Sequence, residues 1–242
     1  MGNIGTCRLC GEEKELCKSH IVPELCYKRA YGDKNRLTKV SISSQGVRNN
    51  VAQKGLRERL LCFDCEQLLC RQYETPFNDY WYQVKSLSRP VKGDTVELTG
   101  VDYRMMKLFH LSIIWRMHEA KEFSSIDLGP YAESIRQMLL SGTPGPEDFI
   151  PIFGFLLVDD ADNVEHGLVA PPMEGRIDHS WVYAACYAGC EWLFLITKRA
   201  SGRQRVFVKG LRESGQMGLI KTHYLETASM KYFVDSLRKD LG

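Results

Sequence analysis

The stretches that decide the fold are Cys7-Arg8-Leu9-Cys10 and Cys62-Phe63-Asp64-Cys65, two Cys-x-x-Cys pairs separated by residues 11–61. A two-residue spacer lets a tight turn aim both sulfurs of a pair at one point, and four thiolates suit a tetrahedral zinc ion. We therefore predict that a structural zinc ion is held by Cys7, Cys10, Cys62 and Cys65. Because the interval is long for a simple zinc ribbon, we expect the segment between the pairs to contain functional residues.

The segment between the pairs contains one histidine, in Ser19-His20-Ile21-Val22-Pro23. Residues 16–22 are predicted to form a strand with His20 near its end, because the proline that follows stops regular ladder pairing. Residues 24–31 read as a short helical turn. Residues 33–51 are rich in Ser, Asn, Gly and Lys and read as an exposed insertion or a weak hairpin.

A helix is expected to begin at the second cysteine pair, near Asp64. Apolar residues recur there at steps of three and four, which is the helical period. Pro76 predicts a kink or a break in this helix.

The order of these features resembles the zinc-stapled HNH, or His-Me finger, endonucleases over residues 1–80. The resemblance implies a ββα finger in which His20 is the general base for the water that attacks a phosphodiester bond of DNA or RNA. It also implies a catalytic Mg²⁺ or Mn²⁺ that stabilises the departing oxygen. Such cleavage needs a base that titrates near neutral pH and a cation where negative charge develops.

The sequence departs from the family at the metal-binding positions. The family usually has Asp or His before the catalytic His and His or Asn after the last zinc cysteine, whereas this chain has Ser19 and Glu66. A carboxylate at Glu66 is a hard ligand suited to Mg²⁺ or Mn²⁺, but a Ser19 hydroxyl is a poor one. The family's Asn before the second pair is missing, and Asn49 and Asn50 lie further upstream.

These departures leave two alternatives open. The finger could be a catalytically degenerate module that binds nucleic acid or a protein partner. His20 could equally be a buried structural histidine or an accessory zinc ligand.

Residues 88–100 are polar, contain Pro90, Gly93 and Gly100, and are predicted to separate a finger at 1–88 from a larger domain at 101–242. In that domain Asp102 is expected to cap a helix running to about residue 122, whose apolar residues occupy most of its circumference. Such a helix is central and buried.

The rest of the larger domain is predicted to be mixed. A second helix is expected over 130–141. The strands of a small antiparallel sheet are expected at 150–158, 167–170, 181–197 around an Ala188-Gly189 turn, and 205–209. A closing helix is expected over 227–241. The predicted fold class is α+β.

Charge is unevenly distributed along the chain. The formal net charge of +2 divides into +5 for residues 1–95, −9 for 96–195 and +6 for 196–242. The two basic ends suit phosphates. Arg57, Arg59 and Arg71 flank the second cysteine pair and are candidates for binding a nucleic-acid backbone, although solvent-exposed charges explain them equally well.

The remaining two-thirds of the chain resembles an uncharacterised group of bacterial proteins, on the segments Leu-Ser-Ile-Ile-Trp-Arg at 111–116 and Leu-Gly-Pro at 128–130. This resemblance carries no known activity of its own. Together with the finger it suggests a toxic or antiviral role, and a protein partner in such a defence system. Apolar stretches are too short to span a membrane, and residues 1–6 lack a basic region followed by an apolar run, so we expect a cytoplasmic protein.

Overall fold

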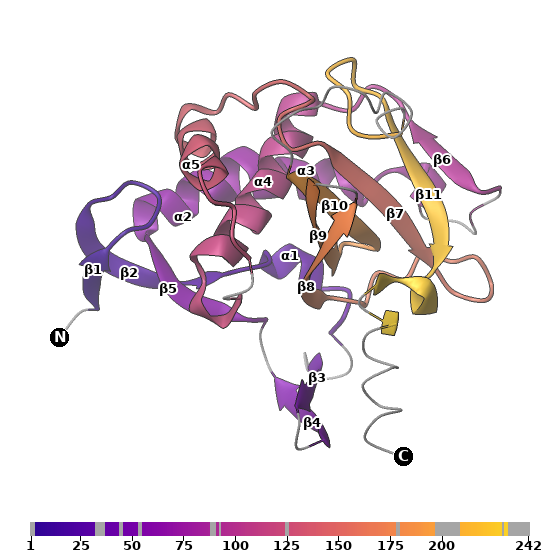
Figure 1. Cartoon of the computed structure of the whole chain (residues 1–242), viewed down its shortest axis with the longest axis horizontal. Coiled ribbons are helices and arrows are strands. Elements are labelled where there is room, and N and C mark those ends of the chain that lie inside the picture. The colour runs from indigo at the N-terminus through magenta and orange to yellow at the C-terminus, as the bar shows by residue number, and fades with distance from the viewer. Residues whose placement is uncertain are drawn as a thin grey trace.

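The computed structural model describes residues 3–31, 37–43, 46–52, 55–87, 91, 93–123, 126–177, 180–196, 209–228 and 230–231 of the 242-residue chain. The protein is α+β, as predicted. Figure 1 shows most of its helices lying between a small sheet near the N-terminus and a larger sheet built from the second half of the chain.

The small sheet has the strand order β1-β2-β5 and is antiparallel. Its strands are β1 (Ile4–Thr6), β2 (Glu13–His20) and β5 (Arg57–Cys62). The predicted strand over 16–22 is therefore confirmed for residues 16–20, which are part of β2, and the strand ends at His20 rather than at Val22. Helix α1 (Glu24–Tyr27) follows β2, and helix α2 (Phe63–Leu69) follows β5, as expected.

The helix after the second cysteine pair is interrupted, as Pro76 predicted. A π-helical turn, Cys70–Glu74, follows α2 and leads into α3 (Thr75–Trp81), whose first turn contains Pro76. Proline has no N–H group to donate to the helical hydrogen-bond ladder. The change from π-helical to α-helical winding therefore lies where one hydrogen bond of the ladder is missing.

The predicted hairpin is also present. Strands β3 (Leu37–Ser43) and β4 (Gly46–Ala52) pair with each other as a separate two-stranded sheet. We call this pair the β3–β4 ribbon, and Figure 1 shows it projecting from the body of the molecule.

The predicted central helix is α4 (Tyr103–Glu119), capped by the Asp102 side chain, which accepts a hydrogen bond of 3.0 Å from the Met105 N–H. Every residue from Met105 to Met117 is buried. Helix α5 (Tyr131–Ser141) ends at Gly142, which has a φ of 71° that favours glycine.

The large sheet differs from the expected one. It has six strands in the order β6-β11-β7-β10-β9-β8, and β11 runs parallel to β7. The prediction of a small, wholly antiparallel sheet is therefore wrong. The strands are β6 (Thr95–Leu98), β7 (Ile152–Val158), β8 (Ala170–Ile177), β9 (Ser180–Tyr187), β10 (Cys190–Ile196) and β11 (Met217–His223).

The local sequence pattern predicted one turn of this sheet correctly but missed or misplaced two of its strands. The tight turn at Ala188-Gly189 is confirmed, and both residues have positive φ, as a two-residue hairpin of this kind requires. In contrast, β6 lies inside the polar segment 88–100, and the strand expected over 167–170 begins only at Ala170. Most of the predicted strand over 205–209 and most of the predicted helix over 227–241 lie outside the described residues.

One hydrophobic core joins the elements on either side of the predicted boundary. The ring of Phe77 on α3 stacks on Phe109 of α4, with centroids 3.6 Å apart, and the Trp81 indole N–H donates to the carbonyl of Ala188 at 2.9 Å. The division into two domains stays a prediction. No helix in the described part of the chain is long and apolar enough to span a membrane.

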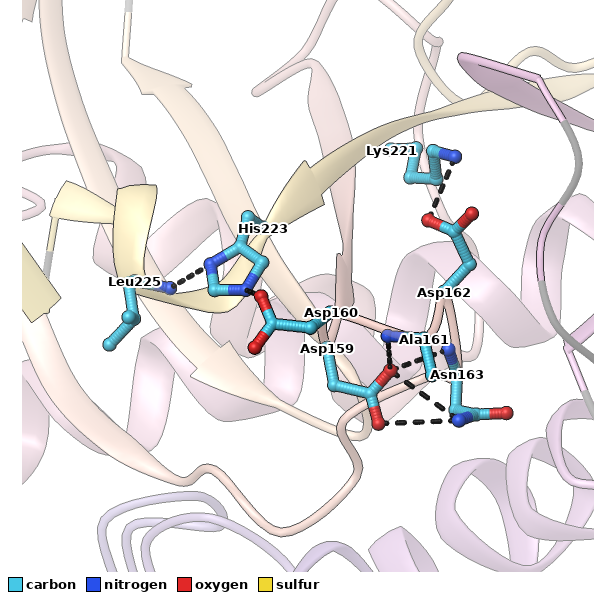
Figure 2. A network of polar contacts seen from close by, with 8 residues as sticks. All are labelled: Asp159, Asp160, Ala161, Asp162, Asn163, Lys221, His223 and Leu225. Atoms are coloured by element: carbon cyan, nitrogen blue, oxygen red, sulfur yellow. Dashed lines mark hydrogen bonds and ion pairs between the residues drawn. The ribbon is translucent and has the colours of Figure 1, made fainter.

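A polar network fastens the loop after β7 to β11 (Figure 2). The Asp159 carboxylate accepts hydrogen bonds of 2.9 Å from the N–H groups of Ala161 and Asn163, which folds the loop on itself. From this loop Asp162 pairs with Lys221 at 3.0 Å, and Asp160 with His223 at 3.1 Å. The network therefore holds the ends of the two parallel strands together.

Lys107 on α4 carries a buried ammonium group whose effect on stability depends on pH. Its Nζ donates to the carbonyls of Phe149 and Ile150, at 2.6 and 2.8 Å, and burial lowers its pKa from 10.5 to about 7. From about pH 7 to 10.5 the unfolded chain holds a proton here that the folded protein has lost, so this group's contribution to stability rises with pH. Denaturant midpoints should therefore climb more steeply with pH than those of Lys107→Met, and parallel pH profiles would contradict the prediction.

Candidate functional site

The four predicted zinc ligands lie together. The Sγ atoms of Cys7, Cys10, Cys62 and Cys65 are all within 4.8 Å of one another. Tetrahedral zinc with Zn–S bonds of about 2.3 Å would place its sulfurs about 3.8 Å apart. The Cys10 and Cys62 sulfurs are 4.0 Å apart, so the cluster fits a structural metal ion such as zinc.

Backbone contacts hold the two cysteine pairs in register. The Arg8 N–H donates to the Leu60 carbonyl at 2.9 Å, which ties the first pair to β5. The Cys62 N–H donates to the Cys7 sulfur at 3.3 Å. Burial opposes ionisation of the Cys7 thiol, but such backbone hydrogen bonds outweigh it and lower the Cys7 pKa below its usual value. Burial instead raises the pKa of the Cys10 and Cys65 thiols, so Cys7 is the thiol that these contacts bring toward the thiolate form.

His20 lies at the end of β2, where the strand gives way to α1. Its Nε2 is 2.5 Å from a carboxylate oxygen of Glu24, the first residue of α1, and the His20 side chain is 23% exposed. The Tyr31 hydroxyl donates to the other Glu24 oxygen at 2.5 Å. Glu24 therefore orients the imidazole, and Tyr31 in turn orients Glu24.

Arg116 of α4 connects His20 to the π-helical turn. Its Nη1 donates to the His20 carbonyl at 2.9 Å and pairs with Glu74 at 3.0 Å. The rest of the guanidinium bonds Ser112, with 3.1 Å to the carbonyl and 3.2 Å to the hydroxyl. Only 1% of the Arg116 side chain is exposed, so it is a buried charge held by Ser112, Glu74 and the His20 carbonyl.

Glu66 of α2 is held from β2 by Ser19. The Ser19 hydroxyl is buried, accepts a hydrogen bond of 3.1 Å from the Leu61 N–H, and hydrogen-bonds Glu66. Burial raises the pKa of Glu66, while Ser19 and the charge of Arg116 oppose that rise. Its Oε1 is buried without a hydrogen-bond partner among the described residues. Ser19 therefore positions Glu66 and has its own hydroxyl committed to the protein.

The residues near His20 do not form a complete preformed cation site. In the described ranges, the four cysteines are the only group in which three or more His, Cys, Asp or Glu ligand atoms converge. Mg²⁺, however, is usually held by one or two carboxylates, with substrate phosphates and water completing its shell. The orphan oxygen of Glu66 fits that mode of binding, and it would be the first protein ligand.

The three predicted phosphate-binding arginines are placed differently from one another. Arg57 is the partner of His20 in the β2–β5 ladder. Arg59 is exposed, donates to the Leu16 carbonyl at 2.8 Å, and lines a hollow of about 250 Å³ that also contains Glu58 and Glu119. Arg71 is exposed on the π-helical turn. Only Arg57 is brought next to His20.

Sequence reasoning missed Glu24, Tyr31 and Arg116 as parts of this site. The spacing of four residues between His20 and Glu24 was the one local signal available. Arg116 lies 96 residues after His20 and gave no local signal.

The site thus places several carboxylates and a buried guanidinium around the His20 imidazole, at the end of the β2–β5 ladder opposite to the one that carries Cys62. The imidazole and the carboxylates can move a proton, whereas the Arg116 guanidinium is already committed to protein groups. The chain matches no protein-family model, no curated protein and no solved structure.

Proposed function

We propose that the protein is a metal-dependent endonuclease that cleaves phosphodiester bonds of DNA or RNA, with His20 as the general base. The observation that carries the proposal is the 2.5 Å pairing of a partly exposed His20 with Glu24, at the end of β2. The neighbouring strand β5 ends at Cys62, one of the four clustered cysteines. A zinc ion bound by the four cysteines would then hold together a ββα finger formed by β2, β5 and α2.

The protein's own residues would divide the work of such a reaction. His20 would take the proton of the attacking water, and Glu24 would hold the ring and stabilise the imidazolium that results. Arg116 would fix the backbone at His20, and Arg57 would position the phosphate. A divalent cation held by Glu66 would stabilise the negative charge on the departing oxygen.

Cleavage by zinc-loaded protein should depend on His20. We expect His20→Ala to lower the rate of cleavage by about 10² to 10⁴, the usual contribution of a positioned general base. The measurement is the cleavage of supercoiled DNA, single-stranded DNA and RNA with Mg²⁺ or Mn²⁺, and with both cations omitted.

His223→Ala is the matched control, because the His223 side chain is 28% exposed and also pairs with a carboxylate, but at the far end of β11. It should cleave at the rate of the parent. Equal activity of folded, zinc-loaded His20→Ala and the parent would rule out His20 as the base.

A second candidate function is a non-catalytic module that binds nucleic acid or a protein. It is favoured by Arg116, whose buried cation already pairs with Glu74, and by the absence of a third converging metal ligand near Glu66 in the described segments. Cleavage absent from both the parent and His20→Ala, with zinc bound and both folded, would favour this candidate.

A further inference from the structure

A cavity of about 220 Å³ contains none of the residues of the candidate site. Three segments line it: the turn after α1, the end of α3 with the residues that follow it, and the loop after β7. The residues that decide its chemistry are Arg29 from the first, Trp81, Tyr82 and Val84 from the second, and Asn163 and His166 from the third. An apolar cavity of about 150 Å³ binds benzene, so this one has room for one planar ring with substituents.

Aromatic rings form much of the lining. Trp81 is fully buried, and its indole N–H is committed to the Ala188 carbonyl at 2.9 Å, so it offers the cavity only ring surface. The rings of Tyr82 and His166 meet edge to face, with centroids 5.6 Å apart. Flat ligands pack well against surfaces of this kind, and nucleobases do so whatever their identity.

Arg29 carries the one charge in the cavity among the lining residues that the structure describes. It is exposed, and its guanidinium lies over the Tyr82 ring, 4.4 Å from the centroid. Stacking on a ring leaves the N–H groups at the edges of the guanidinium available, and these match the oxygens of a phosphate. The described lining contains no carboxylate, so the cavity favours an anionic ligand over a cationic one.

His166 and Asn163 supply neutral hydrogen-bonding groups. Burial, and then the charge of Arg29, lower the pKa of His166 to about 4, so near pH 7 its imidazole has one donor and one acceptor nitrogen. The Asn163 amide nitrogen donates to both oxygens of Asp159, at 3.4 and 3.3 Å, and Figure 2 shows its amide oxygen pointing the other way. Such groups recognise the edge of a heterocycle rather than a plain hydrocarbon ring.

The loop that carries His166 is held in place by the protein itself. Val164 forms a β-bridge with Val158. A Cβ atom on Gly189 would lie 2.7 Å from His166 Nδ1, so this edge of the ring is packed against the Ala188-Gly189 turn. Nε2 is therefore the imidazole nitrogen left for a ligand.

The cavity and the candidate site share one segment of chain. Arg29 lies between Glu24 and Tyr31, whose side chains hydrogen-bond each other at 2.5 Å beside His20. A nucleic acid held by Arg29 would therefore be anchored on the segment that orients His20.

We propose that this cavity binds one unpaired nucleotide, with the base inside it and the phosphate on Arg29. The edge of the base would hydrogen-bond His166 and Asn163. A base inside a duplex must leave its stack to enter such a cavity, so the ligand is a free mononucleotide or an unpaired nucleotide of a single strand. The inference rests on the proposed function in that the second source would make single-stranded DNA or RNA the substrate, but binding does not require cleavage.

The test is calorimetric titration of full-length, zinc-loaded protein without added Mg²⁺ or Mn²⁺. The probes are AMP, GMP, CMP and UMP, a ten-nucleotide single strand of DNA and of RNA, and the corresponding duplexes. We expect Arg29→Glu to weaken binding by about tenfold or more, because a repelling carboxylate replaces the phosphate donor. Arg29→Ala should reduce the slope of log affinity against log salt concentration for a single strand by about 0.7, the contribution of one phosphate contact.

Two further variants test where the base lies. His166→Phe keeps a ring at this position but removes its nitrogens, so it should weaken binding by about threefold to tenfold, the effect of one lost hydrogen bond. Val84→Phe adds a ring at a half-buried lining position and should weaken binding by about tenfold or more, because it occupies the space of the base.

Arg176→Glu is the charge-matched control. Arg176 is also exposed, and its guanidinium lies over the Trp181 ring at 4.0 Å, but it does not line the cavity. The control should change the affinity by less than about twofold, because an exposed charge outside the cavity is screened. His20→Ala should also bind as the parent does.

Binding of the mononucleotides would identify a free nucleotide as the ligand, and binding of the single strands alone would identify a strand. A parent that binds none of these probes, or one that prefers the duplexes, would overturn the proposal, and so would equal losses of affinity in Arg29→Glu and Arg176→Glu. Zinc content and thermal unfolding show that a variant is folded. Arg29-dependent binding without cleavage would contradict the nuclease and keep the nucleotide site, whereas cleavage with Arg29-independent binding would do the reverse.

Discussion

Cys62→Ser is expected to unfold the N-terminal part of the chain and abolish stoichiometric zinc binding. Cys62 is the last residue of β5, and its sulfur and backbone N–H both contact the first cysteine pair. Structural zinc contributes on the order of 10–16 kcal/mol in small zinc-binding peptides, which is comparable to the whole net stability of a typical domain, about 5–15 kcal/mol. Loss of one thiolate from four should therefore remove most of the order in β1, β2 and β5.

Metal analysis and thermal unfolding of the purified variant check this expectation. Cys70→Ser is the matched control, because Cys70 lies just after α2, is partly buried, is not one of the four clustered cysteines, and has its sulfur 3.9 Å from the Thr75 hydroxyl. It should keep one zinc ion and the unfolding temperature of the parent. A Cys62→Ser protein with full zinc content would show that the four-cysteine centre is not the metal site.

Arg116→Met should destabilise the protein by about 3 to 5 kcal/mol, the usual effect of breaking a buried ion pair. Met fills a similar volume but leaves the Glu74 carboxylate, itself 17% exposed, without its cation. It also leaves the His20 carbonyl without the donor at 2.9 Å. Nuclease activity, where present, should fall as well, because the end of β2 loses the contact that fixes it.

The double variant Arg116→Met/Glu74→Gln separates the ion pair from the rest of the effect. Neutralising Glu74 removes the uncompensated buried charge, so a large part of the lost stability should return. Denaturant unfolding of the parent, both single variants and the double variant gives the coupling between the two residues. A double variant no more stable than Arg116→Met would show that the pair is not the source of the loss.

The predictions that succeeded depend on interactions between near neighbours in sequence. Each Cys-x-x-Cys spacing brings its own two sulfurs together, Asp102 caps α4 three residues before its partner Met105, and Pro76 breaks a hydrogen-bond ladder locally. The apolar circumference of α4 likewise required burial whatever the packing partner. Such features follow from residue type and spacing alone.

The parts of the site that were missed depend on long-range packing. Glu66 was chosen as a metal ligand by resemblance, and its burial and its contact with Ser19 could not be read from the sequence. The parallel pairing of β11 with β7 joins segments with no shared local pattern. Long-range pairing is determined by the global arrangement of apolar faces, which periodicity does not specify.

The sequence by itself determined two Cys-x-x-Cys pairs suited to a metal ion, a strand with His20 near its end, a hairpin insertion and a buried central helix, because each depends on contacts within a few residues. Only the tertiary structure decided which groups surround His20. Arg116 reaches its carbonyl from 96 residues away, and it can do so because α4 packs through one continuous core against the elements that carry the cysteines. That placement is a property of the packed core, so it has no signature in any single stretch of the chain.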